Sequence, residues 1–559
     1  MTRREEALTA AKESVKLYRS LAKQGPTSFN PNLATALNYL AITLTELGHR
    51  EEALRATKQC VELYSSLAKH HTSFNSNLAM TLSNLAMMLS ELGHREEALR
   101  ATEQSIALYR SLTKQHPATP NPDLAMALNN HANALSQLER REEALRAIEE
   151  SVGLYRSLAK QDPDTFNQHL AGILNTRAKL LSALGHQEEA LRVINESVEL
   201  YRSLAKQRPS AFNPDLVRSL GGLTIVLSQL GHREEALRIS EESVELCRSL
   251  AKQHPTIFNP DLANSLSHLA NGLSGLGYRE EALRVIEESV ELYRSLAKQR
   301  PTRFNPELAN TLTILANRFS HLGYREEALR VIEESVELYQ LLAKQHPAAF
   351  APNLAKALHT LAVMLSELKR YNEALKVIQE SIKLYQSLAK QHPVSFTPDL
   401  AMALSNLAII LSELGHQEEA LRVIEEPVKL YRSLAKQRPT AFNPNLANSL
   451  SNLAIMLSKL GYSEDALRVI EESVELNRSL VKQHPTAFTP DLAMALNTLA
   501  AMLSELGHHE EAVRAIEESI ELYQSLAKQH PAVFEPKLAM ALENLATILP
   551  ALQPPEEAS

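Results

Sequence analysis

Cysteine is scarce in this chain, and continuous apolar runs are short. Two cysteines, Cys60 and Cys247, occur among 559 residues, which is too few for a disulfide framework and fits a reducing compartment. No continuous apolar run approaches the roughly 18–20 residues that cross a bilayer, and the N-terminus has no apolar secretory segment. We therefore expect a cytoplasmic protein that does not bind membranes.

Motifs for catalysis are also missing. No lysine follows a glycine, which excludes the phosphate-binding P-loop, and the Gly-x-Ser-x-Gly, kinase and dinucleotide motifs are absent. Most histidines recur at fixed repeat positions, and no cluster has the spacing of a zinc site. The net charge of −8 weighs against a general nucleic-acid binder. We expect no catalysis, no cofactor, no metal and no nucleic-acid partner.

The chain is instead dominated by a repeat of about 46 residues. Ten of the eleven intervals between its Arg-Glu-Glu-Ala-Leu blocks are 46 residues long, and one is 45. A fixed period of this size is typical of a solenoid, in which each unit stacks only on its neighbours. The blocks begin at Arg4, Arg50, Arg95, Arg141, Gln187, Arg233, Arg279, Arg325, Tyr371, Gln417, Ser463 and His509.

Each repeat predicts two helices, which we name helix A and helix B. The segment 279–299 carries apolar residues at three- and four-residue steps, with acids in its first turn, and is the model for helix B. Pro301 is expected to end it, and a linker over 300–306 follows. Helix A then begins with Asn305 as the N-cap and Pro306 in the first turn, and ends at Gly323.

Neither helix can bury its apolar stripe alone, so we predict an all-α solenoid of antiparallel helix pairs. We expect one solenoid over 1–559. It has a lone helix B at 4–24 and a terminal helix A at 537–549. The full A–B repeats are predicted at 32–70, 77–115, 123–161, 169–207, 215–253, 261–299, 307–345, 353–391, 399–437, 445–483 and 491–529.

The unit resembles the tetratricopeptide repeat. That family's pattern of apolar and small residues is matched at Leu450, Leu453, Ala454, Leu457, Gly461, Ala466, Ile470 and Ser473, and the resemblance covers nearly the whole chain. Leucine replaces the usual first aromatic residue, and helix B is longer than in the 34-residue version. The longer unit looks most like the extended repeats of kinesin light chains and like arrays attached to nucleotide-switch signalling proteins. The resemblance implies that helix A lines a concave, ligand-binding face.

Residues that vary between the constant leucines of helix A are therefore candidate binding residues. One such position carries five methionines, which favour an adaptable peptide groove or else pack on the neighbouring helix A. A second set is asparagine, whose amide can bind a peptide backbone or simply keep the face soluble. These asparagines are Asn84, Asn130, Asn133, Asn271, Asn317, Asn406 and Asn452.

In the middle of the chain the same variable positions become basic. A focused positive charge would attract an acidic peptide, although chance scatter explains the pattern equally well. The residues concerned are Lys179, Arg218, His268, His321, Lys356 and His359.

Three residues differ in kind from those at the same position of most other repeats. Arg177 and Arg318 replace apolar residues of helix A, so each should reach solvent or an acid. Pro427 lies inside a helix B, where proline costs about 3 kcal/mol, and predicts a kink or a soft joint.

The first hypothesis for function is a non-catalytic scaffold that binds extended peptides or proteins, including acidic segments, on a concave face. The alternatives are the sensing array of a nucleotide-switch receptor and a cargo adaptor like kinesin light chain. The chain starts with an unpaired helix B and ends with an unpaired helix A, so we expect a piece of a longer array or a truncated copy. The oligomeric state stays open.

Overall fold

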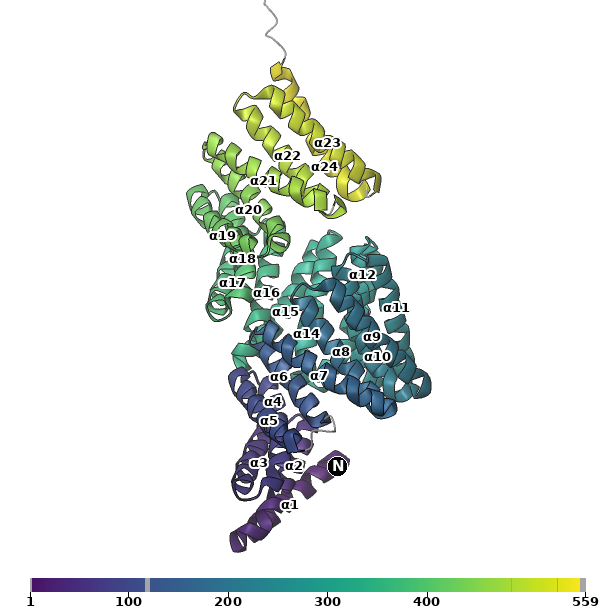
Figure 1. The fold of residues 1–559 in the computed structure, drawn as a ribbon. Helices are drawn as coiled ribbons and strands as arrows, with labels where there is room; N and C mark the ends of the chain where they lie inside the picture. Colours follow the sequence, from purple (N-terminus) through teal and green to yellow (C-terminus); the bar gives the residue numbers. More distant parts are fainter. Residues whose placement is uncertain (1–2, 116–120, 484, 530, 553–559) are drawn as a thin grey trace, which may run out of the picture. The chain divides into compact units, whose positions relative to one another are not determined.

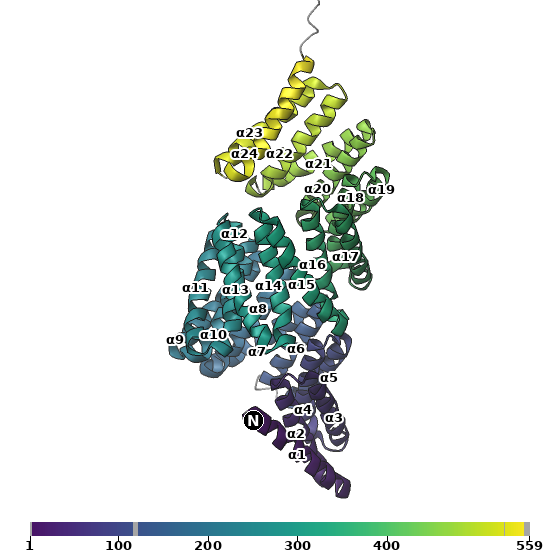
Figure 2. The same ribbon diagram turned by 180° about the vertical axis from the view of Figure 1, so that it is seen from behind.

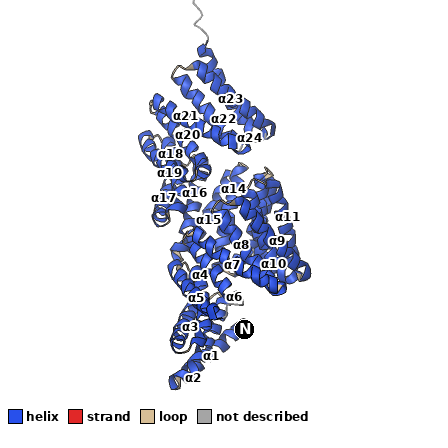
Figure 3. Cartoon of the chain, viewed as in Figure 1, coloured by secondary structure: helices blue, strands red, loops and turns tan. Residues whose placement is uncertain are grey.

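The computed structural model describes residues 3–115, 121–483, 485–529 and 531–552. In these ranges the regular structure consists of 24 α-helices and two short 3-10 helices, with no strand (Figure 3). The predicted all-α class is confirmed. The end of the chain after Leu552 and the segment 116–120 lie outside the described residues.

Odd-numbered helices are the helices B of the repeat. They are α1 (Arg3–Gln24), α3 (Arg50–His70), α5 (Arg95–Gln115), α7 (Arg141–Gln161), α9 (Gln187–Gln207), α11 (Arg233–Gln253), α13 (Arg279–Gln299), α15 (Arg325–Gln345), α17 (Tyr371–Gln391), α19 (Gln417–Gln437), α21 (Ser463–Gln483) and α23 (His509–Gln529).

Even-numbered helices are the helices A. They are α2 (Pro26–Glu46), α4 (Asn75–Glu91), α6 (Pro122–Gln137), α8 (Pro163–Ala183), α10 (Pro209–Gln229), α12 (Pro255–Gly275), α14 (Pro301–His321), α16 (Pro347–Glu367), α18 (Pro393–Glu413), α20 (Pro439–Lys459), α22 (Pro485–Glu505) and α24 (Pro531–Ile548). The two 3-10 helices are η1 (Thr72–Phe74) and η2 (Leu549–Leu552).

The helices form two compact units, Met1–Leu322 and Gly323–Ser559. Within each unit every helix contacts the helices before and after it in the chain, as the colour order in Figures 1 and 2 shows. Each unit is therefore a stack of antiparallel pairs in which contacts are local in sequence. The boundary divides the predicted repeat 307–345 at its A–B turn, and one continuous solenoid over 1–559 stays a prediction.

Helix A begins earlier than the sequence indicated. The predicted linker 300–306 is wrong, because only Arg300 separates α13 from α14, and Pro306 lies inside α14. Proline suits the first position of a helix, where its missing N–H needs no partner, and Pro301 occupies that position. The added turn also buries Phe304, which is 6% exposed. Ten of the described helices A start in this way.

The junctions before α6 and α4 differ from the other ten. Asn121 caps α6 in the way predicted for Asn305, since its side chain accepts hydrogen bonds from the backbone N–H groups of Asp123 and Leu124. At the one interval of 45 residues, which lacks the proline, η1 precedes α4.

The turn from helix A to helix B needs a left-handed backbone. Gly323 has φ of 84°, and glycines at the same position of eight other repeats also have positive φ. Glu139 and Lys369 replace this glycine and still adopt φ of 62° and 60°. The predicted glycine cap is confirmed.

Helices A and B of one repeat are joined by a buried serine. Ser289 Oγ of α13 donates to the carbonyl of Ala263 in α12 at 2.6 Å, and the same bond recurs between α9 and α8, α17 and α16, and α21 and α20. Pro427 stands at this serine position in α19 and cannot donate. The helix nevertheless runs unbroken from Gln417 to Gln437, and a kink or soft joint at Pro427 stays a prediction.

Two helices have the length and composition of membrane spans. The sequence predicted none, because no continuous apolar run is long enough to cross a bilayer. α16 and α18 reach a mean hydropathy of 1.2 and 1.5 over an 18-residue window, and about half of each window, 50% and 44%, is buried inside the structure. Both helices pack against helices B on either side, α16 against α15 and α17, and α18 against α17 and α19. Burial in a stack gives helices A an apolar composition of this kind.

We predict that Pro427→Ser stabilises the second unit. The variant restores a backbone N–H in α19 and the hydroxyl that bonds the carbonyl of the preceding helix A in other repeats. Together these changes should raise the free energy of unfolding by about 3 kcal/mol, measured by urea titration. Pro439→Ser is the control, because Pro439 starts α20 and should not be improved by serine. Equal stability of wild type and Pro427→Ser would contradict the prediction.

Candidate protein-interaction surface

The helix A layer lies on the inner side of each stack. Helices A of neighbouring repeats contact one another directly, as between α4 and α6, α10 and α12, and α20 and α22. Neighbouring helices B are instead joined through long side chains, such as Arg156 Nη2 to Glu196 Oε2 at 2.6 Å. In a curved stack the more closely spaced layer is the inner one. Helix A therefore supplies the concave face of each unit.

Methionine and isoleucine side chains are exposed on this face, and we call them the inner apolar row. They occupy two positions of helix A that lie seven residues, or two turns, apart, and all are 38–48% exposed. The first unit contributes Ile42, Met80, Met87, Met126 and Ile225, and the second contributes Met402, Ile409, Ile455, Met494 and Met540. The five predicted methionines are thus accessible. Met87 and the isoleucines stand at the helix A position that carries Asn133, Asn271 and Asn317 in other repeats, and sequence reasoning named only the asparagines there.

The predicted asparagines lie beside this row with different degrees of exposure. Asn133 and Asn271 are exposed, and Asn84, Asn130, Asn317, Asn406 and Asn452 are partly buried. Some of their amides are already used within the protein. Asn271 Oδ1 accepts a hydrogen bond from Arg318 at 2.7 Å, and Asn406 Nδ2 lies 2.7 Å from His359 Nε2.

The structure does not support a single basic patch from the predicted residues. His359 is 8% exposed and burial lowers its pKa to about 4, so it carries no charge at neutral pH. Burial also lowers the pKa of the partly buried His268. The side chains of Lys179, Arg218 and Lys356 are exposed overall, but Arg218 pairs with Asp215 on its own helix. Desolvation of the Lys179 ammonium by neighbouring side chains, and then the charge of the nearby Arg218, lower the pKa of Lys179.

The members of that predicted patch also belong to different units. Lys179, Arg218, His268 and the exposed His321 lie in the first unit, and Lys356 and His359 lie in the second. The proposed patch over all six residues is therefore wrong as a set of exposed cations, because His359 is buried and neutral.

Arg177 and Arg318, which replace apolar residues, both form hydrogen bonds with polar side chains. Arg177 Nη2 donates to Glu189 Oε1 at 2.6 Å and lies 3.4 Å from Glu149 Oε1, which confirms the predicted pairing with an acid. Arg318 bonds the neutral side chains of Ser274 and Asn271 instead, and burial lowers its pKa.

The inner face also carries partly buried carboxylates that sequence reasoning did not include among the candidate binding residues. Burial raises the pKa of Asp261 and Glu307 in the first unit and of Asp399 and Asp491 in the second. Arg218 opposes this shift at Asp261 and Lys356 opposes it at Asp399. The inner face therefore has mixed charge rather than a positive one. Among the described residues, no group of three or more histidine, cysteine or acidic side chains is placed to hold a metal ion.

Comparison with known proteins agrees with the helix-pair geometry. A tetratricopeptide repeat model matches residues 33–70, 78–118, 124–164, 216–256, 262–300, 446–486 and 492–532, which is just over half of the chain. A second tetratricopeptide model matches 353–433. This chain belongs to the tetratricopeptide repeat family. A model of anaphase-promoting complex subunit 5 also matches one segment, 167–208, and no curated protein matches the chain.

Solved structures align with parts of this chain at low sequence identity. BtubC (BKLC) from P. vanneervenii is 19% identical and aligns with a TM-score of 0.38 over 44% of this chain and 92% of its own. Tetratricopeptide-like repeats described as kinesin light chain, from Podosopora anserina, are 22% identical with a TM-score of 0.32, over 40% of this chain and 98% of their own. Tetratricopeptide repeats generally mediate protein–protein interactions.

We predict that His359 makes the second unit sensitive to acid. Its pKa of about 4 in the folded chain lies below the usual 6.5 of the unfolded chain, so the unfolded state binds more protons between these values. The contribution of the neutral His359 to the free energy of unfolding is then fully present above about pH 6.5. It falls as the pH drops towards 4, with a loss of about 2 kcal/mol at pH 5. Urea unfolding at pH 7 and pH 5 measures this.

The comparison variant is His359→Asn, since Asn497 occupies the same position in a later repeat. It should lose less stability than wild type between the two pH values, whereas His346→Asn, at an exposed position, should behave like wild type. Equal pH dependence of wild type and His359→Asn would contradict the buried neutral histidine.

Proposed function

We propose that this tetratricopeptide chain is a non-catalytic scaffold that binds extended peptide or protein segments along its inner face. The observation that carries the proposal is the inner apolar row, in which ten methionine and isoleucine side chains stay exposed on helix A. Exposed apolar side chains aligned on one face are typical of interaction sites, and methionine adapts to partners of different shape.

The polar residues of the inner face support an extended ligand. Asn133 and Asn271 are exposed along the inner apolar row and offer amide donors to a peptide backbone, and the Asn133 amide oxygen offers an acceptor. Alternating apolar contacts and amide hydrogen bonds suit a segment that runs across successive repeats. The mixed charge of this face gives no preference for a strongly acidic ligand there.

The proposal places the protein in a reducing compartment such as the cytoplasm, without a cofactor. Cys60 and Cys247 are free and buried, and burial raises the pKa of each thiol to about 11. Both cysteines therefore behave as small core residues rather than as reactive groups.

The decisive test measures peptide binding to the full-length chain, with substitutions in its second unit. Peptides are selected from a displayed random library against the wild-type protein, and their dissociation constants are measured by fluorescence anisotropy. The double variant Met402→Glu, Met494→Glu should bind the selected peptides at least about tenfold more weakly, because each glutamate replaces an apolar contact with a solvated charge.

The matched control is Leu341→Glu. Leu341 is 56% exposed on α15, a helix B, so this variant places one glutamate outside the inner face, against the two of the methionine variant. This variant should bind like wild type. If the methionine variant binds as wild type does and Leu341→Glu does not, the peptides use the outer layer and the proposed inner binding face is wrong.

A further inference from the structure

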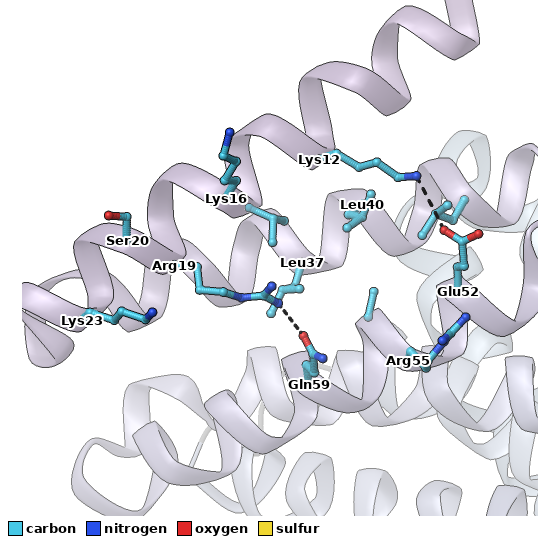
Figure 4. A pocket seen from close by; sticks show the side chains of 13 residues that line it. Lys12, Lys16, Arg19, Ser20, Lys23, Leu37, Leu40, Glu52, Arg55 and Gln59 are labelled. Carbon is cyan, nitrogen blue, oxygen red and sulfur yellow. Dashed lines mark hydrogen bonds and ion pairs between the residues drawn. The ribbon is translucent and has the colours of Figure 1, made fainter.

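A groove on the outer side of the first unit differs in chemistry from the inner face. It lies between α1 and α3, both helices B, above the α2 helix, and encloses about 590 Å³. Figure 4 shows Lys12, Arg19 and Lys23 on α1 and Arg55 and Gln59 on α3 around it. Its lining residues are Lys12, Val15, Lys16, Arg19, Ser20, Lys23, Leu37, Leu40, Leu44, Glu52, Arg55, Ala56 and Gln59.

Positive charge in this groove is not balanced. Five cationic side chains, from Lys12, Lys16, Arg19, Lys23 and Arg55, share the groove with a single carboxylate, that of Glu52. Lys12 Nζ lies 3.6 Å from Glu52 Oε2, and Arg19 Nη2 donates to the neutral Gln59 Oε1 at 2.9 Å (Figure 4). On the outer side of α1, Lys16 lies 3.9 Å from Glu13, an exposed pair that contributes little.

The equivalent groove between α5 and α7 provides a reference inside the same protein. It is lined by two arginines and two glutamates, and Arg110 Nη2 pairs with Glu150 Oε2 at 2.8 Å. Counting from the start of each Arg-Glu-Glu-Ala-Leu block, Glu103 and Ala107 correspond to Lys12 and Lys16, and Glu150 corresponds to Gln59. The excess positive charge of the first groove thus comes from three positions of the repeat at which its residues, Lys12, Lys16 and Gln59, differ from those of the α5–α7 groove.

Apolar side chains form the floor beneath these cations. Leu37 and Leu44 of α2 are 2% exposed, and Leu40 beside them is partly exposed. In the α5–α7 groove the residue at the position of Leu40 is His131. The first groove therefore offers apolar contact and positive charge together, along about 16 Å of α1 between Lys12 and Lys23.

We propose that the groove between α1 and α3 binds an acidic, leucine-containing segment of a partner protein. Its carboxylates pair with Lys12, Lys16 and Arg19, and its apolar side chains reach Leu40 and the neighbouring floor. This site is separate from the inner face, because Leu37, Leu40 and Leu44 lie on the side of α2 away from its exposed Ile42. It goes beyond the proposed function, and either can fail without the other.

Two features favour a peptide over other anions. The cations of α1 and α3 surround an apolar floor, which a phosphate backbone would leave unused. Lys12 and Arg19 also point across the groove towards α3 and not outward to a flat surface such as a membrane (Figure 4). The net charge of −8 for the whole chain further disfavours nucleic acid.

The test measures binding of a fluorescein-labelled peptide that alternates glutamate with leucine to the full-length chain. The groove variant Lys12→Glu, Lys16→Ala, Gln59→Glu gives α1 and α3 the side chains of the α5–α7 groove, a set that is already accommodated in this fold. It should fold with an unchanged circular dichroism spectrum and bind the peptide at least about tenfold more weakly. Wild-type binding should weaken as salt is raised.

The charge-matched control is Lys344→Glu with Lys390→Glu, two exposed lysines on α15 and α17, which should bind like wild type. Met402→Glu, Met494→Glu should also bind like wild type, which separates this site from the inner face. A peptide with serine in place of leucine should bind more weakly.

Three outcomes would overturn the proposal. Equal binding by the groove variant would remove the site, and equal binding of the serine peptide would remove the role of the floor. Equal binding of oligothymidylate or of phosphatidylserine vesicles to wild type, lost in the groove variant, would assign the groove to a nucleic acid or to a lipid surface instead.

Discussion

Each helix of this protein has an apolar stripe that only the adjacent helices can cover. In α13, for example, Ala282, Ile286 and Val290 are at most 4% exposed, and this burial requires α12 on one side and α14 on the other. The buried serine that bonds the carbonyl of the preceding helix A sets how closely the two helices approach. The closely spaced helix A layer, the wider helix B layer and the outer grooves all follow from this packing.

Much of the fold is readable from the sequence because the same pattern is written in every repeat. Helix type, helix number and the glycine turn follow from spacing and from Gly323 and its counterparts. The start of helix A does not, because most repeats contain two prolines that could occupy the first turn. Burial of Phe304 favours the earlier one, and this is a tertiary effect that no local capping rule contains.

The candidate surfaces were harder to predict than the helices. Variation between constant leucines correctly marked Met80 and Met402 as accessible, but it also marked His359, which is buried. A position next to the exposed face can vary freely when a short polar side chain and a histidine both fit there. The α1–α3 groove was missed because the helices B look uniform, and its character depends on a few departures, such as Lys12 and Lys16, that only matter once two helices are seen side by side.

The junction between α3 and α4 shows how such an array absorbs a change of length. A 3-10 helix rises about 2.0 Å per residue against about 1.5 Å in an α-helix, so fewer residues cover the same distance. The three residues of η1 thus make up for the residue missing from the 45-residue interval before α4 starts. The loss of one residue can therefore be absorbed at this kind of junction without a change in the helices that follow it.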